Sequence, residues 1–250
     1  MSTAPTHRLS KSKVAAFEHC PLRMWLQVHR PELAQHDGDT LARFQFGHDV
    51  GEKARFLQPD GVLIEAVPDI RAALAHTAEL IATGPHHPLF EATFRHADVL
   101  VRVDVLEPDD QGGWRAVEVK ASNRVKPTHL ADLSTQIWVM RGAGVPISQA
   151  IIRHVSNRID WRRPDATMVR FRDEDVTQRI ERYVEGRPAI VAEAMATANL
   201  PALSRNMGPH CRRPFSCEFQ AHCTARQEVP LIANASAGQL GNWTANPRAA

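Results

Sequence analysis

VLVRVDVLE (residues 99–107) and, after a turn, WRAVEVKA (residues 114–121) are the most strand-like stretches of the chain and decide its fold. β-branched residues dominate both stretches and alternate with polar ones, which is typical of β-strands. Apolar spacing and start and stop signals predict helices around them. Further strands are expected at residues 61–67, 90–95 and 150–155. Helices are expected at residues 10–28 with a restart at Pro21, from Leu41 to Leu57, and at residues 69–83, 129–141 and 173–199, the last with a break near Pro188. This order of elements predicts an α/β fold.

Size and composition favour a single domain. The chain has 250 residues, of which 43% are hydrophobic, and this is enough to bury one full core. We expect that domain over residues 1–223 and a loosely held tail over residues 224–250, which show no sustained period. No apolar run is long enough to cross a bilayer, and the start lacks the apolar region of a secretory signal. A cytoplasmic location, reduced thiols and no membrane partner are therefore expected.

Two carboxylates and a lysine fall on matching positions of the two deciding strands. Because alternate side chains share a face, Arg102 and Asp104 point one way from the first strand, and Glu118 and Lys120 point together from the second. If the strands are neighbours, both acids can reach one Mg²⁺ or Mn²⁺ ion. Glu91, about one strand earlier, is a candidate for extending the site toward a second cation.

This grouping suits the cleavage of a phosphodiester. A metal held by two carboxylates supplies an activated water and neutralises charge on the phosphate, and a neighbouring lysine orients the water or stabilises the developing charge. Only five of the 30 basic residues are lysines, so Lys120 beside these acids is informative. The plainer alternative is a pair of amphipathic strands whose outer faces are solvated.

The four cysteines are placed unevenly. Cys20 lies near the N-terminus, whereas Cys211, Cys217 and Cys223 follow one another at intervals of six. Three thiolates in one segment can bind one metal centre, with Cys20 as the fourth ligand. The candidates are a [4Fe–4S] cluster and a structural Zn²⁺. The chain lacks the paired short knuckles of zinc sites, which favours the cluster. Four buried free thiols are the other interpretation.

In this order, Cys-Pro, Asp, Glu-x-Lys, Gln and three cysteines resemble the RecB-like branch of the PD-(D/E)xK nuclease superfamily. The resemblance is to its iron–sulfur members, such as the CRISPR-associated exonucleases and the AddB nuclease domain, and it runs from about Leu9 to Cys223. It implies a restriction-endonuclease-like core, with a central mixed β-sheet flanked by helices. It also implies that residues 10–28 and 205–223 are joined at a four-cysteine [4Fe–4S] centre.

The resemblance assigns roles to single residues. Asp104 and Glu118 match the metal-binding acids, with the Val119 carbonyl as a further ligand, Lys120 matches the catalytic lysine, and Gln136 matches a glutamine that places DNA or the lysine. It implies a Mg²⁺- or Mn²⁺-dependent deoxyribonuclease, an exonuclease on single-stranded DNA ends. Two alternatives stay open: a non-catalytic nucleic-acid-binding or assembly module with the nuclease fold, and a zinc-stabilised protein without a nucleic-acid role.

The chain departs from the family pattern at two positions. The metal-binding histidine of the pattern G-x-x-x-H is replaced, because Gly47 is followed four residues later by Gly51. His48 lies three residues from that position, almost a full helical turn away. The tyrosine expected four residues after the glutamine is Met140. The missing histidine favours the non-catalytic module.

Overall fold

A computed structural model describes residues 9–66, 69–157 and 169–228 of the chain. Its centre is a seven-stranded sheet in the order β2-β3-β4-β5-β6-β7, with β1 paired to β4. The strands are β1 (Leu9–Ser10), β2 (Val62–Leu63), β3 (Leu89–His96), β4 (Val99–Pro108), β5 (Trp114–Lys120), β6 (Ile147–Val155) and β7 (Phe171–Asp175).

The sheet is mixed. The pairs β3–β4, β4–β5 and β6–β7 are antiparallel, whereas β5 and β6 are parallel and are connected through a helix. β1 and β2 join the sheet by short parallel pairings. The α/β class and the mixed sheet expected from the sequence are confirmed, including the adjacency of the two deciding strands.

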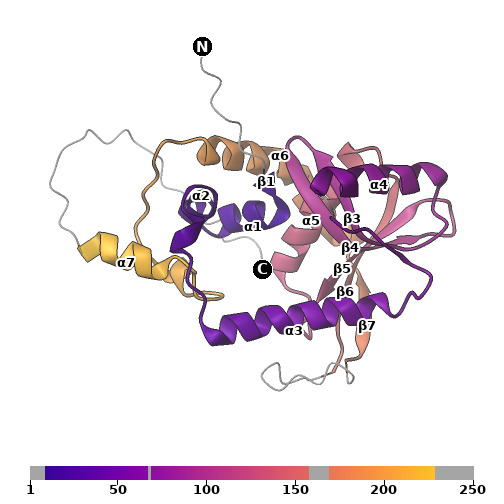
Figure 1. Ribbon diagram of the computed structural model, residues 1–250, viewed down its shortest axis with the longest axis horizontal. Coiled ribbons are helices and arrows are strands. Elements are labelled where there is room, and N and C mark those ends of the chain that lie inside the picture. Colours follow the sequence, from indigo (N-terminus) through magenta and orange to yellow (C-terminus); the bar gives the residue numbers. More distant parts are fainter. Residues whose placement is uncertain (1–8, 67–68, 158–168, 229–250) are drawn as a thin grey trace, which may run out of the picture.

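Helices surround this sheet (Figure 1). They are α1 (Lys11–His19), α2 (Pro21–His29), α3 (Gly38–Arg55), α4 (Ile70–Thr83), α5 (Pro127–Gly142), α6 (Thr177–Ala198) and α7 (Gln220–Glu228), with 3₁₀ turns at Pro31–Leu33 and Pro209–Cys211. Local signals explain several starts: the side chains of Ser10, Asp37 and Asp69 accept hydrogen bonds from the first turns of α1, α3 and α4. None of the described helices is long and apolar enough to cross a membrane.

The main core lies between the sheet and α5. This helix packs against β3, β4, β5 and β6, and against α1 and α6 beside it. Its fully buried side chains include Leu133, Ile137 and Met140. α3 lies on the other face, where Phe46 and Val50 pack with Val119 and Val155. The site residues of β5 that face α5 are therefore enclosed between the sheet and α5, with α1 beside them.

The side chains of β4 do not keep one alternation along the whole strand. Val101 and Val103 pack in the main core, but Val105 packs with Val117 and Ile151 in a separate cluster. Ile152, the neighbour of Ile151 in β6, belongs to the main core, so the two clusters lie on opposite faces. The alternation expected from the sequence therefore does not run through the whole strand: Val105 lies on the face opposite to Val101 and Val103, because β4 turns over at Asp104.

Two other expectations about elements are wrong. Residues 171–175 form β7, so the helix expected from residue 173 begins only at Thr177. That helix then continues through Pro188 without the expected break. A proline removes one helical hydrogen bond, but α6 is held by core side chains on both sides of it, namely Ile180, Val184, Val191 and Ala194.

α2 and the segment that carries the last three cysteines meet beside α6, away from the sheet (Figure 1). Both oxygens of the Glu218 carboxylate accept hydrogen bonds from Nε of Arg23, at 2.9 and 3.0 Å, and Oε1 also accepts one from Gln27 at 2.7 Å. Glu218 is only 8% exposed, so this ion pair is shielded from water. Residues 224–228, expected in the tail, belong to α7, and residues 229–250 lie outside the described residues.

Candidate active site and cysteine centre

The site forms at an interruption in the sheet, on the edge of β4 that faces β5. β3 pairs with Val99 and Leu100 along one edge of β4. β1 pairs with the same two residues and therefore lies on the other edge, the one that faces β5. β5 pairs with the same edge only from Val105 onward. Between these pairings the two strands separate, and the Val119 amide donates a hydrogen bond to Oδ2 of Asp104 at 2.7 Å. The carboxylate thus replaces a backbone acceptor where β4 and β5 separate.

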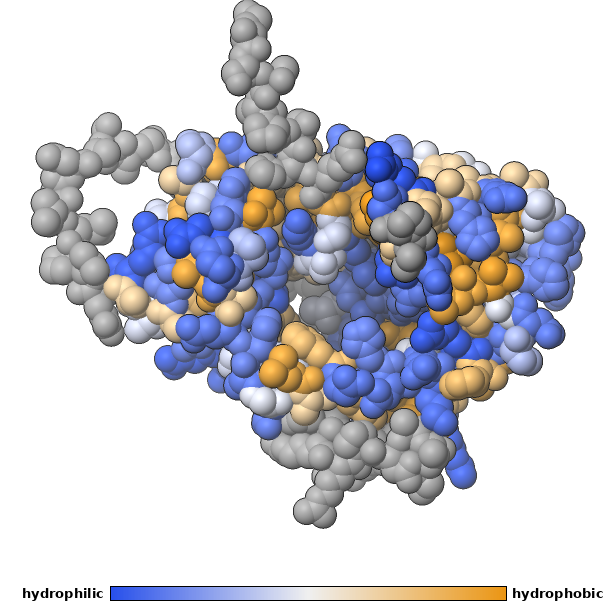
Figure 2. Space-filling view, viewed as in Figure 1, coloured by the Kyte–Doolittle hydropathy of each residue, from blue (hydrophilic) through white to orange (hydrophobic). Residues whose placement is uncertain are grey.

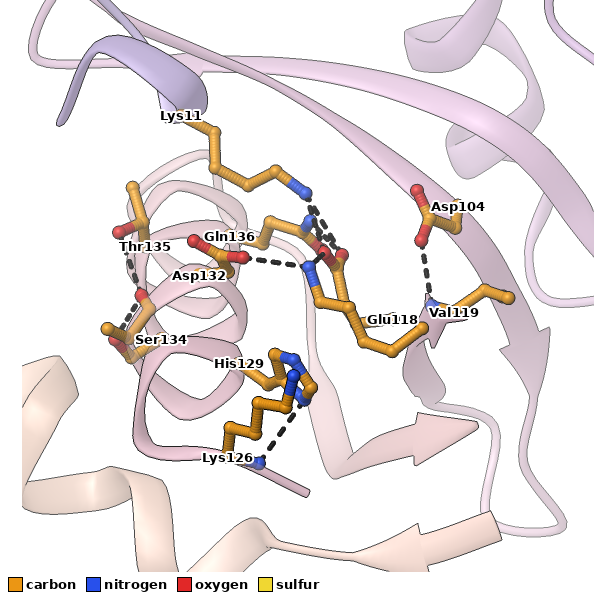
Figure 3. A network of polar contacts seen from close by, with 12 residues as sticks. Lys11, Asp104, Glu118, Val119, Lys126, His129, Asp132, Ser134, Thr135 and Gln136 are labelled. Atoms are coloured by element: carbon orange, nitrogen blue, oxygen red, sulfur yellow. Dashed lines mark hydrogen bonds and ion pairs between the residues drawn. The ribbon is translucent and has the colours of Figure 1, made fainter. Parts of the chain in front are cut away.

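Glu118 lies one residue beyond the Val105–Val117 pair, opposite Asp104 in the register, and is 1% exposed. Nζ of Lys11 donates to both of its carboxylate oxygens, at 2.9 and 3.0 Å. Nζ of Lys120 lies 2.6 Å from Oε1, and the amide of Gln136 donates to Oε2. Figure 3 shows these donors converging on Glu118 from α1, β5 and α5, with Asp104 turned toward the Val119 amide.

Lys120 is fixed between two carboxylates. Besides Glu118, its ammonium group contacts Oδ2 of Asp132 at 2.7 Å. Asp132 and Gln136 are four residues apart on α5, so they lie on the same side of that helix. α5 therefore presents an acceptor to Lys120 and a donor to Glu118, and it fixes both β5 side chains.

The charges of the site shift each other's pKa values. Burial alone would raise the pKa of Glu118, but the ammonium groups of Lys11 and Lys120 outweigh it and lower the value to about 2. Burial would lower the pKa of Lys120, and the Glu118 and Asp132 carboxylates raise it instead. Glu118 and Lys120 are therefore ionised throughout the physiological range.

Asp104 behaves in the opposite way. Burial, and then the negative charge of Glu118, raise the pKa of Asp104 to about 7. His129, on the first turn of α5, is also perturbed: burial and the nearby Lys120 and Lys126 lower its pKa to about 4, so the imidazole is neutral at pH 7. Groups with strongly raised pKa values and groups with strongly lowered pKa values thus lie around one carboxylate pair, which is typical of functional sites.

Glu91 is placed at the border of the site. The β3–β4 register puts it opposite Asp104, between the pairs Phe90–Val105 and Ala92–Val103, and its backbone is in the left-handed region with φ of 57°. Oε2 of Glu91 lies 3.3 Å from Nε of Arg102. Its described ionic contact is thus with Arg102, on the strand that also carries Asp104.

The donors present suit a hard divalent cation that keeps several waters. Two carboxylates on facing strands and the carbonyl of Val119 are oxygen ligands, which Mg²⁺ and Mn²⁺ prefer. Oε1 of Gln136 is buried and has no hydrogen-bond partner, so it can accept from a water bound at Glu118. Among the described residues, no group of three or more His, Cys, Asp or Glu side chains is placed to hold a metal ion. A cation here would therefore rest on two acids.

All four cysteines line one cavity, although Cys20 comes from the start of the described chain and the others come from its end. All four are free thiols. Burial raises the pKa of Cys217 to about 11 and also raises that of Cys223, and Cys20 contributes to both shifts. Leu22, Leu26 and Phe219 are among the apolar walls of the cavity, and polar residues, including His19, Arg23 and His210, also line it. The thiols are near one another but are not arranged around a single ion.

Two residues of the site were not anticipated from the sequence. Lys11 is 107 residues from Glu118 and reaches it only because β1 pairs beside the site. Asp132 could have been found from the sequence, because it lies four residues before Gln136 and therefore on the same side of the expected helix. The candidate substitute His48 is exposed on α3, and Gly51, where the resemblance would place a histidine, is half-buried on the same helix.

Comparisons with known proteins give matches in structure alone. The chain matches no family model and no curated protein. The crystal structure of SSO0001 is similar with a TM-score of 0.38 and 14% identity, covering 90% of this chain and 89% of that one. An alkaline exonuclease from Laribacter hongkongensis, LHK-Exo, gives a TM-score of 0.39 and 17% identity, covering 76% and 89%. Its complex with dAMP gives 0.36 and 16% over the same shares.

Proposed function

We propose that this protein is a metal-dependent deoxyribonuclease of the PD-(D/E)xK type, which hydrolyses phosphodiester bonds at single-stranded DNA ends. The observation that carries the proposal is the convergence of Asp104, Glu118 and Lys120 where β4 and β5 separate. Their pKa shifts, the arrangement of α5 and the motif order of the sequence support the same conclusion. Separate strands supply the acids, so their meeting is a property of the fold.

The residues of the chain have distinct roles in this reaction. Asp104, Glu118 and the Val119 carbonyl would hold the cation, which neutralises phosphate charge and makes a bound water more acidic. Lys120 is cationic and fixed by Asp132, so its ammonium is positioned to stabilise charge that develops on the phosphate. Gln136 fixes Glu118 through its amide and keeps one oxygen available to a water.

Access for a strand is consistent with the surface. Figure 2 shows a hollow between α1 and α3, surrounded mostly by hydrophilic side chains. Lys11 is the first residue of α1, and its ammonium contacts Glu118 at the site. A flexible single strand reaches such a recessed position more readily than a duplex does.

We further propose that Cys20, Cys211, Cys217 and Cys223 hold a [4Fe–4S] cluster. The four thiols line one cavity, and thiolates on such a cluster bind different irons, so they need not surround one point. Zn²⁺ is the alternative, and it requires all four sulfurs about 2.3 Å from one ion. Anaerobically purified protein should be brown and contain iron, whereas colourless protein with stoichiometric zinc would exclude the cluster.

The nuclease assignment is tested on end-labelled single-stranded DNA with Mn²⁺. The parent protein should degrade it from the ends, and Glu118→Ala and Lys120→Ala should lose the activity. If both variants degrade DNA as the parent does, the assignment is wrong. If no metal supports cleavage while DNA binding persists, the protein is a non-catalytic module, an alternative favoured by Gly51 in place of the family histidine.

A further inference from the structure

Lys11 is held at the site from both ends of its own segment. On one side, Ser10 pairs with Leu100 in the β1–β4 ladder and caps α1. On the other side, the Glu18 carboxylate near the end of α1 accepts two hydrogen bonds from Arg187, both at 2.8 Å. Arg187 is 2% exposed, so this end of α1 is fixed in the core. The segment therefore presents the Lys11 ammonium to Glu118.

Lys11 is the donor that a cation at Glu118 displaces most readily. Lys120 has a second carboxylate partner in Asp132, and Gln136 is fully buried. Within the described part of the chain, the hydrogen bonds of the Lys11 ammonium go to Glu118 alone, and its side chain is 23% exposed. A lysine side chain is flexible, so its ammonium can move while α1 stays in place.

The net charge of the site depends on Lys11. Two ammonium groups, on Lys11 and Lys120, face three carboxylates, so the net charge is −1 with all of these groups ionised; the carboxylates belong to Asp104, Glu118 and Asp132. A divalent cation brings it to +1, which matches the single negative charge of a phosphodiester. Without Lys11, the loaded site would be neutral and would attract a phosphate less.

We propose that Lys11 is an internal counter-cation of the site, which competes with the divalent metal for Glu118 and, once displaced, contacts a phosphate of the bound strand. Metal binding and strand binding are then linked, because the strand provides the displaced ammonium with a new anionic partner. This inference rests on the proposed function, since it takes Glu118 to be a metal ligand. Lys11 acts here as a positioning residue for metal and substrate.

The metal half of the inference is tested by calorimetric titration of Mn²⁺ into DNA-free protein. Lys11→Met should bind Mn²⁺ about tenfold more tightly than the parent, because one positive charge near the ion is gone. Lys11→Arg should keep the weaker affinity. Lys13→Met is the matched control, since Lys13 lies on the same helix and has no side-chain contact with the site among the described contacts; its affinity should equal that of the parent.

The substrate half is tested with a phosphorothioate single strand, which resists cleavage, at saturating Mn²⁺. Lys11→Met should bind it about tenfold more weakly, and the salt dependence should fall by the equivalent of one phosphate contact, a slope change of about 0.7. Lys11→Arg and Lys13→Met should keep both values. A structural defect alone would not tighten Mn²⁺ binding while weakening DNA binding.

The outcomes separate this inference from the proposed function. If Glu118→Gln abolishes Mn²⁺ binding but Lys11→Met leaves it unchanged or weaker, the metal is at Glu118 and the role of Lys11 is overturned. If Glu118→Gln leaves Mn²⁺ binding intact, the proposed function itself fails. Should thermal melting show that Lys11→Met is unfolded, Lys11→Gln removes the charge but keeps a hydrogen-bond donor, and the same tightening is expected of it.

Discussion

The backbone amide of Val119 and the carboxylate of Asp104 are joined by a hydrogen bond of 2.7 Å at the point where β4 and β5 separate. The bond ties the acid of one strand to the backbone of the other, directly beside Glu118. Asp104 is half-buried there, next to a second carboxylate. Desolvation and the negative charge of Glu118 raise its pKa to about 7, although the hydrogen bond from Val119 acts in the opposite direction.

Asp104 should make the metal-free protein less stable as the pH rises. Between pH 4 and pH 7 the unfolded chain has this carboxyl ionised while the folded protein keeps it protonated, so the folded state binds more protons and stability falls across this interval. Asp104→Asn removes the effect and should gain about 1–2 kcal/mol over the parent at pH 8 relative to pH 5. Thermal melting without metal measures it, and the exposed Asp60→Asn should track the parent.

Metal binding should reverse this pH dependence. A cation at Asp104 must displace its proton, so Mn²⁺ affinity is expected to weaken as the pH falls through about 7. Melting with and without Mn²⁺ should show a larger stabilisation at pH 8 than at pH 6. An equal increase in Tm at both pH values would mean that Asp104 is not a ligand.

Asp132 should matter for catalysis through Lys120. The ammonium of Lys120 is held between Glu118 and Asp132, and Asp132→Asn leaves it with one carboxylate. We expect the rate constant on single-stranded DNA to fall about tenfold in Asp132→Asn and about 100-fold or more in Lys120→Met. Lys13→Met, whose side chain has no contact with the site among the described contacts, is the control. A parental rate in Asp132→Asn would show that Lys120 is positioned without α5.

Glu218 should contribute to stability whether or not iron is bound. Its carboxylate joins α2 to the segment of the last three cysteines, through Arg23 and Gln27, and is shielded from water. Glu218→Gln should cost about 1–3 kcal/mol and lower Tm by several degrees. Glu32→Gln breaks the exposed pair with Arg30, which should change Tm by less than about 2 °C. If the Glu218 variant melts with the parent, this ion pair adds no stability to the contact between the two segments.

The grouping of the acids was predictable from the sequence because it depends on a local rule. Alternation within residues 114–120 places Glu118 and Lys120 together, and the turn at residues 108–113 makes the neighbouring strand a partner. The capping acid Asp69 and the stop at Gly84 likewise fix the ends of α4 from nearby residues. Such features need no knowledge of distant parts of the chain.

The remaining features depend on long-range pairing. Lys11 is brought to Glu118 by the pairing of β1, a two-residue strand that is too short to show a period in the sequence. Lysine is rare in this arginine-rich chain, and this rarity was a usable signal for Lys11. The reversal of β4 at Asp104 follows from the curl of the sheet and from packing on both of its faces. The continuation of α6 through Pro188 follows from core contacts that outweigh a local helix breaker.

Gly51 offers a direct test of the family pattern. It lies inside α3, next to Val50, which packs in one cluster with Val119. A Cβ atom at Gly51 would meet no atom within 4 Å, so a side chain can be added there without strain. Gly51→Ala should therefore raise the stability by about 0.5–1 kcal/mol, as expected for a glycine inside a helix, and leave Mn²⁺ affinity unchanged.

Gly51→His supplies the histidine that the proposed nuclease assignment expects at this position. If α3 faces the metal, this variant should tighten Mn²⁺ binding and increase the cleavage rate, each by about tenfold for an added ligand. Gly47→His is the matched control, because Gly47 lies one turn earlier on the same helix and is equally free of contacts. Titration of Mn²⁺ into the three variants separates the effects. If Gly51→His and Gly47→His bind Mn²⁺ alike, α3 does not face the metal, and the cation rests on the two acids of the sheet alone.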